Sequence, residues 1–278
     1  MSNILLIAQI TFREARRRKI MWAALILGAA FLLIYGVGLY FIHRELMREF
    51  AQRPQNLPTF LNMLVMMALY AVNFLMIAMA ILTSVDTIAG EVGSGAIQAV
   101  ATKPIRRAEI LLGKWLGFAG MLVLYAALMI GGVLLSTWLV ARYVPPHPIE
   151  GALLMLLEGL VLLNLSLLGG TFLSTLANGV MVFGLFGVAF VGGWMEQFGS
   201  MMHSETVVNI GIVSSLIMPS ETIWRWAAYL MQPPLFRNFN ASPFGSASQP
   251  SAAMIIYTGI YLIAVMTLAL QNFRKRDL

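Results

Sequence analysis

Long apolar stretches constrain the fold of this chain more than any other feature of its sequence. A helix needs about 20 apolar residues to cross the hydrocarbon of a bilayer, and several stretches of the 278-residue chain reach that length. Charged residues make up only 11% of the chain, whereas soluble domains contain about 25%. We therefore predict an all-α polytopic membrane protein with six transmembrane helices, at residues 20–42, 58–89, 112–141, 152–176, 180–196 and 252–271.

The pattern of charge excludes several other classes of protein. The formal net charge is +6, but the basic residues form short clusters at the ends of the apolar stretches, as membrane orientation requires. We therefore expect contact with membrane lipids and no nucleic acid partner. The absence of cysteine excludes disulfides, thiolate metal sites and cysteine nucleophiles.

The basic clusters also predict how the chain is oriented. Twelve of the 18 Lys and Arg residues lie in the N-terminal segment, the loop before the third span and the C-terminal end. Because cytoplasmic segments are rich in Lys and Arg, we expect both termini in the cytoplasm and the protein in the plasma membrane. The alternative is a seventh span at Val207–Pro219, which would place the C-terminus outside.

Residues 197–251 are predicted to form an external gate region before the sixth span. The apolar run Val207–Pro219 has 13 residues, which is short for a full span and favours short re-entrant or interfacial helices. Trp224 and Trp226 follow this run and are typical of an aromatic belt at the membrane surface. We assign Pro219 and Trp224 to the pathway or its gate.

The N-terminal segment 2–19 is too polar to span a bilayer but is amphipathic. Ile4, Ile7 and Phe12 fall near one helical face, and basic residues populate the rest of the surface. A basic amphipathic helix of this kind lies in the plane of the membrane surface. We therefore predict an interfacial helix before the first span.

The segment 90–111 combines small residues with positive charge. Small residues around Gly95 allow a partner to approach the backbone, and Pro104 interrupts any helix that continues from the second span. The arginines that follow offer charge to a partner protein or to anionic lipid head groups. We predict a cytoplasmic coupling loop whose functional residues are Glu91, Gly95, Pro104, Arg106, Arg107, Gly113 and Lys114.

This segment resembles the cytoplasmic loop of the type-2 ABC-exporter permease family. The resemblance rests on Glu91, on the Pro-Ile-Arg-Arg sequence from Pro104 and on the Leu-Leu-Gly-Lys sequence that ends at Lys114, and it extends to both ends of the chain. It implies a short coupling helix between spans two and three that docks on a separate ABC ATPase subunit, which would bind ATP and Mg²⁺. It also implies that six spans form half of a pathway, completed by a second copy or a paralogue.

The chain has no phosphate-binding loop of the form G-x-x-x-x-G-K-[ST]. We therefore expect the permease subunit of an ATP-driven exporter, with no catalytic activity and no cofactor of its own. One alternative is an ATP-independent secondary carrier, although repeats, broken helices and buried charges near the bilayer centre are not evident. An intramembrane enzyme is less favoured, since no pair of acids lies inside the predicted spans and every histidine lies outside them.

Individual polar and small residues within the predicted spans also attract functional interpretations. Glu158 is the one charge in an otherwise uncharged stretch, and intramembrane acids are usually functional, so we assign Glu158 to the pathway with Asn164 as a candidate bonding partner. Asn178-Gly179 is a strong turn signal and predicts the connection between the fourth and fifth spans. Gly113 and Gly117 form a small-residue pair that serves either packing within one subunit or a dimer contact.

A methionine-rich cluster near the end of the fifth predicted span is a candidate metal site. Its members are Met195, Met201, Met202 and His203. Thioether and imidazole groups suit Cu(I), but the chain contains 19 methionines, so the cluster has little specificity. We predict no metal site.

Overall fold

The computed structural model describes residues 3–50, 56–90, 106–233 and 251–275. The helices are α1 (Asn3–Arg17), α2 (Lys19–Glu49), α3 (Leu57–Ser84), α6 (Arg107–Ala141), α7 (Pro148–Gly170), α8 (Thr175–Met201), α9 (Glu205–Ile217), α10 (Ser220–Met231) and α12 (Ala252–Lys275). No strand occurs in the described parts of the chain. Six helices, α2, α3, α6, α7, α8 and α12, are long and apolar enough to cross a bilayer. The predicted all-α membrane fold with six spans is thus confirmed.

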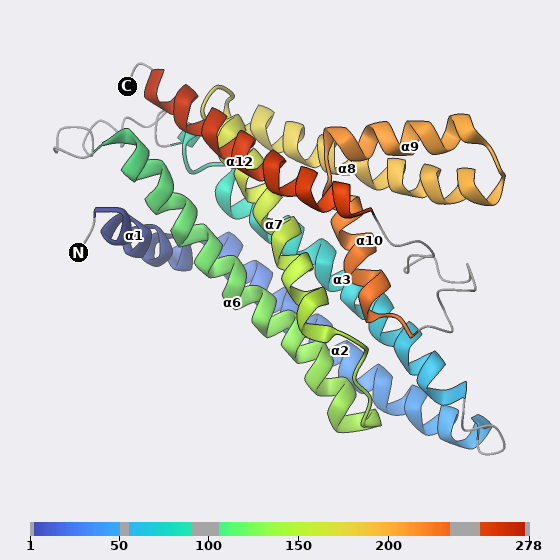
Figure 1. Cartoon of the computed structure of the whole chain (residues 1–278). Coiled ribbons are helices and arrows are strands. Elements are labelled where there is room, and N and C mark those ends of the chain that lie inside the picture. Colours follow the sequence, from blue (N-terminus) through green and yellow to red (C-terminus); the bar gives the residue numbers. More distant parts are fainter. Residues whose placement is uncertain (1–2, 51–55, 91–105, 234–250, 276–278) are drawn as a thin grey trace.

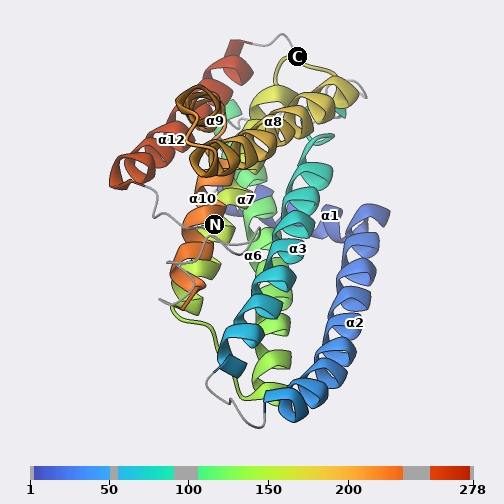
Figure 2. The ribbon, with the colours of Figure 1, turned by 90° about the vertical axis from the view of Figure 1, so that its right-hand side faces the viewer.

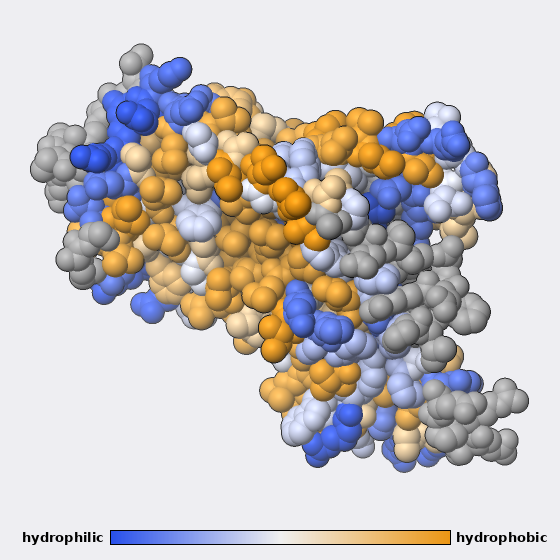
Figure 3. All heavy atoms as spheres, in the orientation of Figure 1, coloured by the Kyte–Doolittle hydropathy of each residue, from blue (hydrophilic) through white to orange (hydrophobic). Residues whose placement is uncertain are grey.

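The spanning helices bring the two ends of the described chain to the same end of the molecule (Figure 1). The starts of α1 and α6 and the end of α12 lie there, whereas the end of α2 and the hairpin between α8 and α9 lie at the opposite end. Figure 3 shows hydrophobic surface over the middle of the molecule and hydrophilic residues gathered towards both ends. This distribution suits a protein whose middle faces lipid.

Two helices, α3 and α7, form the centre of the bundle. In each, 61% of the most apolar stretch is buried, compared with 11% for α2 and 17% for α12. Figure 2 shows α2 standing at the outside of the bundle, and α12 lies at its other side. The 35 residues of α6 extend about 52 Å at about 1.5 Å per residue, well beyond a hydrocarbon layer of about 30 Å. This helix is therefore long enough either to tilt or to project beyond the apolar layer.

The helices α9 and α10 form a bent pair. They contain 13 and 12 residues, and their axes meet at 104°. Pro219 at the bend cannot continue α9 because it lacks a backbone N–H. From there α9 lies along α8 and α10 packs on α7 (Figure 1). Two short helices thus occupy the region predicted to hold them, while their depth in a membrane stays a prediction.

The connection between α7 and α8 corrects the sequence prediction. The turn comprises residues 171–174, and Asn178, which was expected to form it, lies inside α8. The buried Asn178 side chain donates to the carbonyl oxygens of Val85 and Ser166, at 3.3 and 2.8 Å. These bonds occupy the N–H donors of a side chain that would otherwise favour a turn, and α8 begins about one turn earlier than predicted.

The second span is also shorter than predicted. α3 ends at Ser84 and residues 85–88 form a turn, whereas the prediction extended the span to residue 89. The Ser84 hydroxyl donates back to the Ala80 carbonyl at 2.6 Å, a local bond that competes with continuation of the helix. Most of the predicted coupling loop lies outside the described residues, including Glu91, Gly95 and Pro104.

Candidate functional site

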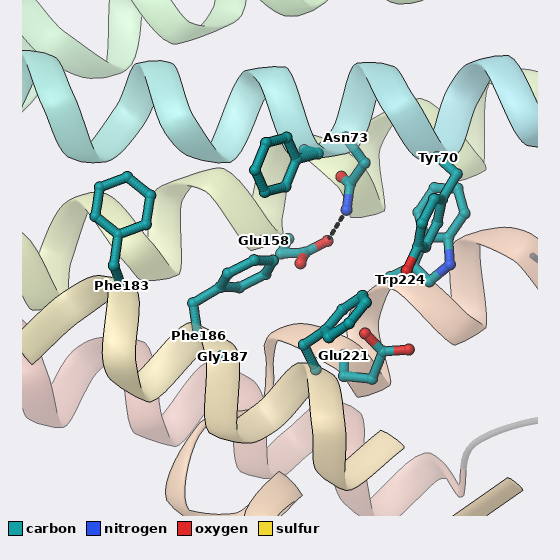
Figure 4. Close-up of a pocket in the computed structure, with 10 residues that line it drawn as sticks. Tyr70, Asn73, Glu158, Phe183, Phe186, Gly187, Glu221 and Trp224 are labelled. Carbon is teal, nitrogen blue, oxygen red and sulfur yellow. Dashed lines mark hydrogen bonds between the residues drawn. The ribbon is translucent and has the colours of Figure 1, made fainter. Parts of the chain in front are cut away.

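A cavity of about 390 Å³ lies between α3, α7, α8 and α10. Its lining residues are Tyr70, Asn73, Phe74, Glu158, Phe183, Phe186, Gly187, Phe190, Glu221 and Trp224. Ligand cavities typically measure about 300–1,000 Å³ and combine apolar walls with a few convergent polar groups. Figure 4 shows this combination, with two carboxyl groups and one amide among aromatic rings.

Glu158 is the polar residue that α7 contributes to the cavity, and it is 1% exposed. The Asn73 amide on α3 donates to the Glu158 carboxylate, with 2.9 Å between Nδ2 and Oε2 (Figure 4). Burial of a carboxyl group is costly unless it is hydrogen-bonded. The bond from α3 therefore stabilises Glu158 where it lines the cavity.

Glu221 reaches the same cavity from the first turn of α10 and is 9% exposed. A carboxylate is favourable at this position because the N-terminal end of a helix carries partial positive charge. Its side chain lies against Gly193 of α8, where any added Cβ would collide with it. Within the described parts of the chain, the Glu221 carboxylate has no hydrogen bond or ion pair.

Trp224 forms part of the cavity wall and does not belong to a surface belt. The side chain is 3% exposed and its ring meets Tyr70 edge to face, with 5.2 Å between the ring centroids and 64° between the planes. The prediction of an aromatic belt at this residue was wrong because the bend at Pro219 turns α10 into the bundle. Its assignment to the pathway is consistent with its place in the cavity wall.

Glycines let α9 approach α8 closely. A Cβ added at Gly211 would lie 2.6 Å from both the Gly192 carbonyl oxygen and the Glu196 Cβ. Helix backbones come this close only where the residues are small. Glu196 also accepts a hydrogen bond from Arg225 of α10 at 2.6 Å. Both short helices are therefore attached to α8, which carries one wall of the cavity.

A second region of interest lies where α1 crosses the start of α6. A Cβ at Gly113 would lie 2.6 Å from the Ile7 Cβ, and one at Gly117 would lie 2.8 Å from the Thr11 Cβ. The two glycines thus serve packing within the subunit, which was one of the two readings of this pair. α1 and α6 are held together over more than one turn.

Glu109 strengthens this junction from the first turn of α6, before the apolar part of that helix. Asn3 of α1 donates its side-chain amide to the Glu109 carboxylate at 3.1 Å, and the Arg106 backbone N–H donates to the same oxygen at 3.1 Å. The hydrogen bond from Asn3 and then that from Arg106 hold the pKa of the Glu109 carboxyl below its ordinary value. The charged form is therefore the one that joins α1 to α6.

The basic residues assigned to coupling have three different surroundings. The Arg107 guanidinium donates to the carbonyl oxygens of Phe273 and Arg274 at 3.5 and 3.3 Å, so it binds the C-terminal turn of α12. Lys114 is buried, at 6% exposed, whereas Arg106 is exposed. Arg106 is therefore placed to contact a partner directly. A coupling role for Arg107 or Lys114 stays a prediction, and it would have to act through their contacts within this chain.

Asn164, predicted to share the pathway with Glu158, lies elsewhere. Its side-chain oxygen accepts a hydrogen bond from Trp115 of α6 at 2.5 Å, and its Nδ2 donates to the Leu262 carbonyl of α12 at 3.2 Å. Asn164 therefore joins three helices, while Glu158 bonds to Asn73. Of the predicted pathway residues, the structure brings together Glu158 and Trp224 in the cavity and places Pro219 at the bend nearby.

Several residues that line the cavity were not predicted from the sequence. The missed residues are Tyr70, Asn73, Phe74, Phe183, Phe186, Gly187, Phe190 and Glu221. Phe186, Phe190 and Trp194 recur every four residues, a helical signal that could have marked one face of α8. No such signal exists for Glu221, which falls in the region assigned to the outside. Glu221 lies outside the predicted spans, yet it lines the same cavity as Glu158.

Metal binding has no support from clustered ligands. Among the described residues, no group of three or more His, Cys, Asp or Glu side chains is placed to hold a metal ion. Met201 and Met202 of the methionine-rich cluster are 52% and 74% exposed at the end of α8.

The fold and the cavity define a polytopic α-helical membrane protein with a ligand-sized site inside its bundle. The family model described as ABC-2 family transporter protein matches residues 5–278, and the chain belongs to this family. It is therefore a permease component of an ABC transporter, a membrane component that is not itself catalytic and that associates with an ABC ATPase subunit. Membership sets aside the alternatives of a secondary carrier and an intramembrane enzyme. No curated protein matches the chain.

Proposed function

We propose that this permease exports its substrate from the cytoplasm with energy from ATP hydrolysis on a separate subunit. ATP and Mg²⁺ bind to that partner, and two permease chains, either two copies or a copy and a paralogue, form the complete pathway. Both termini lie in the cytoplasm of a cell bounded by this plasma membrane. The excess of Lys and Arg at the end of the molecule that carries the termini supports this orientation.

The observation that carries the proposal is the assembly of α1, α6 and α12 at that end. Gly113 seats Ile7 of α1, and Arg107 binds the last turn of α12. Because the predicted coupling loop leads directly into α6, displacement of this loop would move three helices as one unit. A family with a separate ATPase subunit requires such a rigid receiving element.

Contacts further along α6 connect this unit to the cavity. A Cβ at Gly159 of α7 would lie 2.8 Å from the Leu122 side chain of α6, and Gly159 follows Glu158 in the chain. Trp115 of α6 is hydrogen-bonded to Asn164 of α7. Movement of α6 along its axis would therefore shift α7 and change the position of the Glu158 carboxylate. This is a physical route from the ATPase side to the cavity.

The bent pair of α9 and α10 is suited to close the cavity on the other side. α10 supplies Glu221 and Trp224 to the wall, and the Met231 carbonyl at its end accepts a hydrogen bond from Asn62 of α3 at 2.9 Å. We infer that α10 acts as the external gate. Its opening would require the contacts of Trp224 with Tyr70 and of Asn62 with Met231 to separate.

The test is purification of the tagged, full-length chain from membranes of its own host in mild detergent. We expect an ATPase subunit with a phosphate-binding loop to co-purify, and the complex to hydrolyse ATP. In liposomes, ATP on the face that carries the termini should drive substrate towards the opposite face. Recovery of the chain without any ATPase, even after cross-linking in intact membranes, would contradict the proposal.

A further inference from the structure

The cavity is lined by two acidic side chains, Glu158 and Glu221, and by no Lys, Arg or His. Arg225 of α10 donates to Glu196 at 2.6 Å, and its charge also attracts the Glu221 carboxyl group, although the two form no ion pair among the described residues. The Glu158 carboxylate has a neutral donor, Asn73, and the Glu221 carboxylate has no hydrogen bond or ion pair in the described parts of the chain. A positively charged ligand would supply what these two groups lack.

Asn73 adds a further acceptor that is buried in the cavity wall. The residue is 5% exposed, and its Nδ2 is committed to Glu158. Its Oδ1 is buried and has no hydrogen-bond partner in the described structure. Because buried polar atoms are rarely left unpaired, this oxygen would accept a hydrogen bond from a bound molecule. Two carboxyl groups and an amide oxygen together favour a ligand that carries hydrogen-bond donors, and acidic groups form their strongest hydrogen bonds with cationic donors.

Aromatic rings define the rest of the ligand. Phe74 and Phe186 both line the cavity, and their rings are in contact, with centroids 6.5 Å apart and planes at 46°. From Phe186 a row of rings continues along α8 through Phe190, Trp194 and Phe198, with centroid distances of 6.4, 6.2 and 5.7 Å. This row leads towards the end of α8 that lies away from the termini (Figure 1). Aromatic faces attract cations as well as apolar groups, so the row forms a path for an apolar cation.

We propose that the cavity binds an organic cation with an apolar or aromatic body, such as a substituted ammonium. The two carboxylates hold the charged centre and the rings of α3, α8 and α10 enclose the body. The volume of the cavity, about 390 Å³, lies within the range of cavities that hold drug-sized molecules. That this cation is the exported cargo rests on the proposed function, whereas its binding does not.

Binding is tested with the full-length permease in lipid nanodiscs. The probe is 2-naphthylmethylammonium, whose N–H groups can donate hydrogen bonds, and 2-naphthylmethanol is an uncharged control of nearly the same shape. Calorimetric titration should show saturable binding of the cation and no saturable binding of the alcohol. Glu158→Gln and Glu221→Gln should each weaken cation binding by at least about tenfold, while Glu205→Gln, an exposed acid at the start of α9, should leave the affinity unchanged.

Both Gln variants are expected to keep the fold, so that a loss of binding can be assigned to the site. Glutamine at position 158 retains an oxygen for the Asn73 amide, and position 221 has no hydrogen bond to lose. Equal affinity of the wild type and both Gln variants, equal binding of the two probes, or no binding to the wild type would each overturn the inference. If the cation binds but no ATPase co-purifies, the binding site stands and the proposed ATP-driven export is rejected. If an ATPase co-purifies but the cation does not bind, only the proposed class of ligand is rejected.

Discussion

Asn73 and Glu158 are joined by a hydrogen bond of 2.9 Å that links α3 to α7 in the wall of the cavity. Both residues are buried, at 5% and 1% exposed. In an apolar bundle such a bond specifies how two helices face each other, since loss of the amide leaves a carboxyl group without its donor. The cavity and the helix packing therefore depend on the same pair.

Asn73→Ala should lower the free energy of unfolding by about 1–3 kcal/mol, the usual cost of leaving a buried polar group without its hydrogen-bond partner. Asn209→Ala is the matched control, because Asn209 is exposed on α9, and it should change stability by less than about 0.5 kcal/mol. Chemical denaturation of the purified protein measures both. Equal stability of the two variants would show that the bond between α3 and α7 contributes nothing.

Gly113→Leu should separate α1 from α6, because even a Cβ at this position would lie 2.6 Å from Ile7 and 2.9 Å from the Ile4 carbonyl oxygen. Overpacking of this kind costs about 1–3 kcal/mol, and hydrogen exchange of α1 should become faster. Gly120→Leu lies on the same helix with nothing within 4 Å of its Cβ and should leave exchange unchanged. Unchanged protection in Gly113→Leu would argue against close packing of α1.

Gly211→Ala tests whether the seam between α8 and α9 requires glycine. Alanine in a helix normally stabilises by up to about 1 kcal/mol relative to glycine, and Gly184→Ala, with open space at its Cβ, should show this gain. Gly211→Ala should instead lose about 1–3 kcal/mol through the clash with the Gly192 carbonyl. The two substitutions should thus shift the melting temperature in opposite directions. A gain in both would mean that α9 is not closely packed.

Arg107→Glu should act mainly on α12. It removes the donors to the Phe273 and Arg274 carbonyls and sets a negative charge at a helix C-terminus, which costs about 0.3–1 kcal/mol. Hydrogen exchange in the last turn of α12 should rise. Arg106→Glu, at an exposed position, should leave α12 protected while weakening co-purification of the ATPase. If both variants left α12 unaffected, the role of Arg107 in the fold would have to be rejected.

The chain contains no cysteine, so single cysteines report its orientation in cells. Substitutions at Leu176 and Lys275 should react only with membrane-permeant reagents, and those at Met47 and Ile149 should also react with impermeant ones. Leu176 is 80% exposed and Ile149 is 71% exposed, whereas the buried Asn178 would be an unsuitable position. Reaction of Lys275→Cys with an impermeant reagent would overturn cytoplasmic termini.

The sequence by itself determined the class of the fold. Apolar stretches such as 20–42 require lipid contact whatever their partners are, and lengths near 20 residues allow one helix per crossing. The same reasoning holds for the break at Pro219, since proline cannot donate to the preceding turn of a helix. These properties are local, so one sequence was sufficient to predict them.

The tertiary structure alone decided the site. Asn73, Glu158 and Glu221 belong to three helices, and their meeting depends on how α3, α7 and α10 pack. The 104° bend between α9 and α10 brings Glu221 to the cavity, and Gly193 leaves room for its side chain. For the same reason Asn178 is a buried donor to Val85 and Ser166 instead of a turn residue. In a buried environment, hydrogen bonds to residues distant in the chain outweigh the local conformational preference of a residue. No local pattern in the sequence shows which distant residues will be its partners.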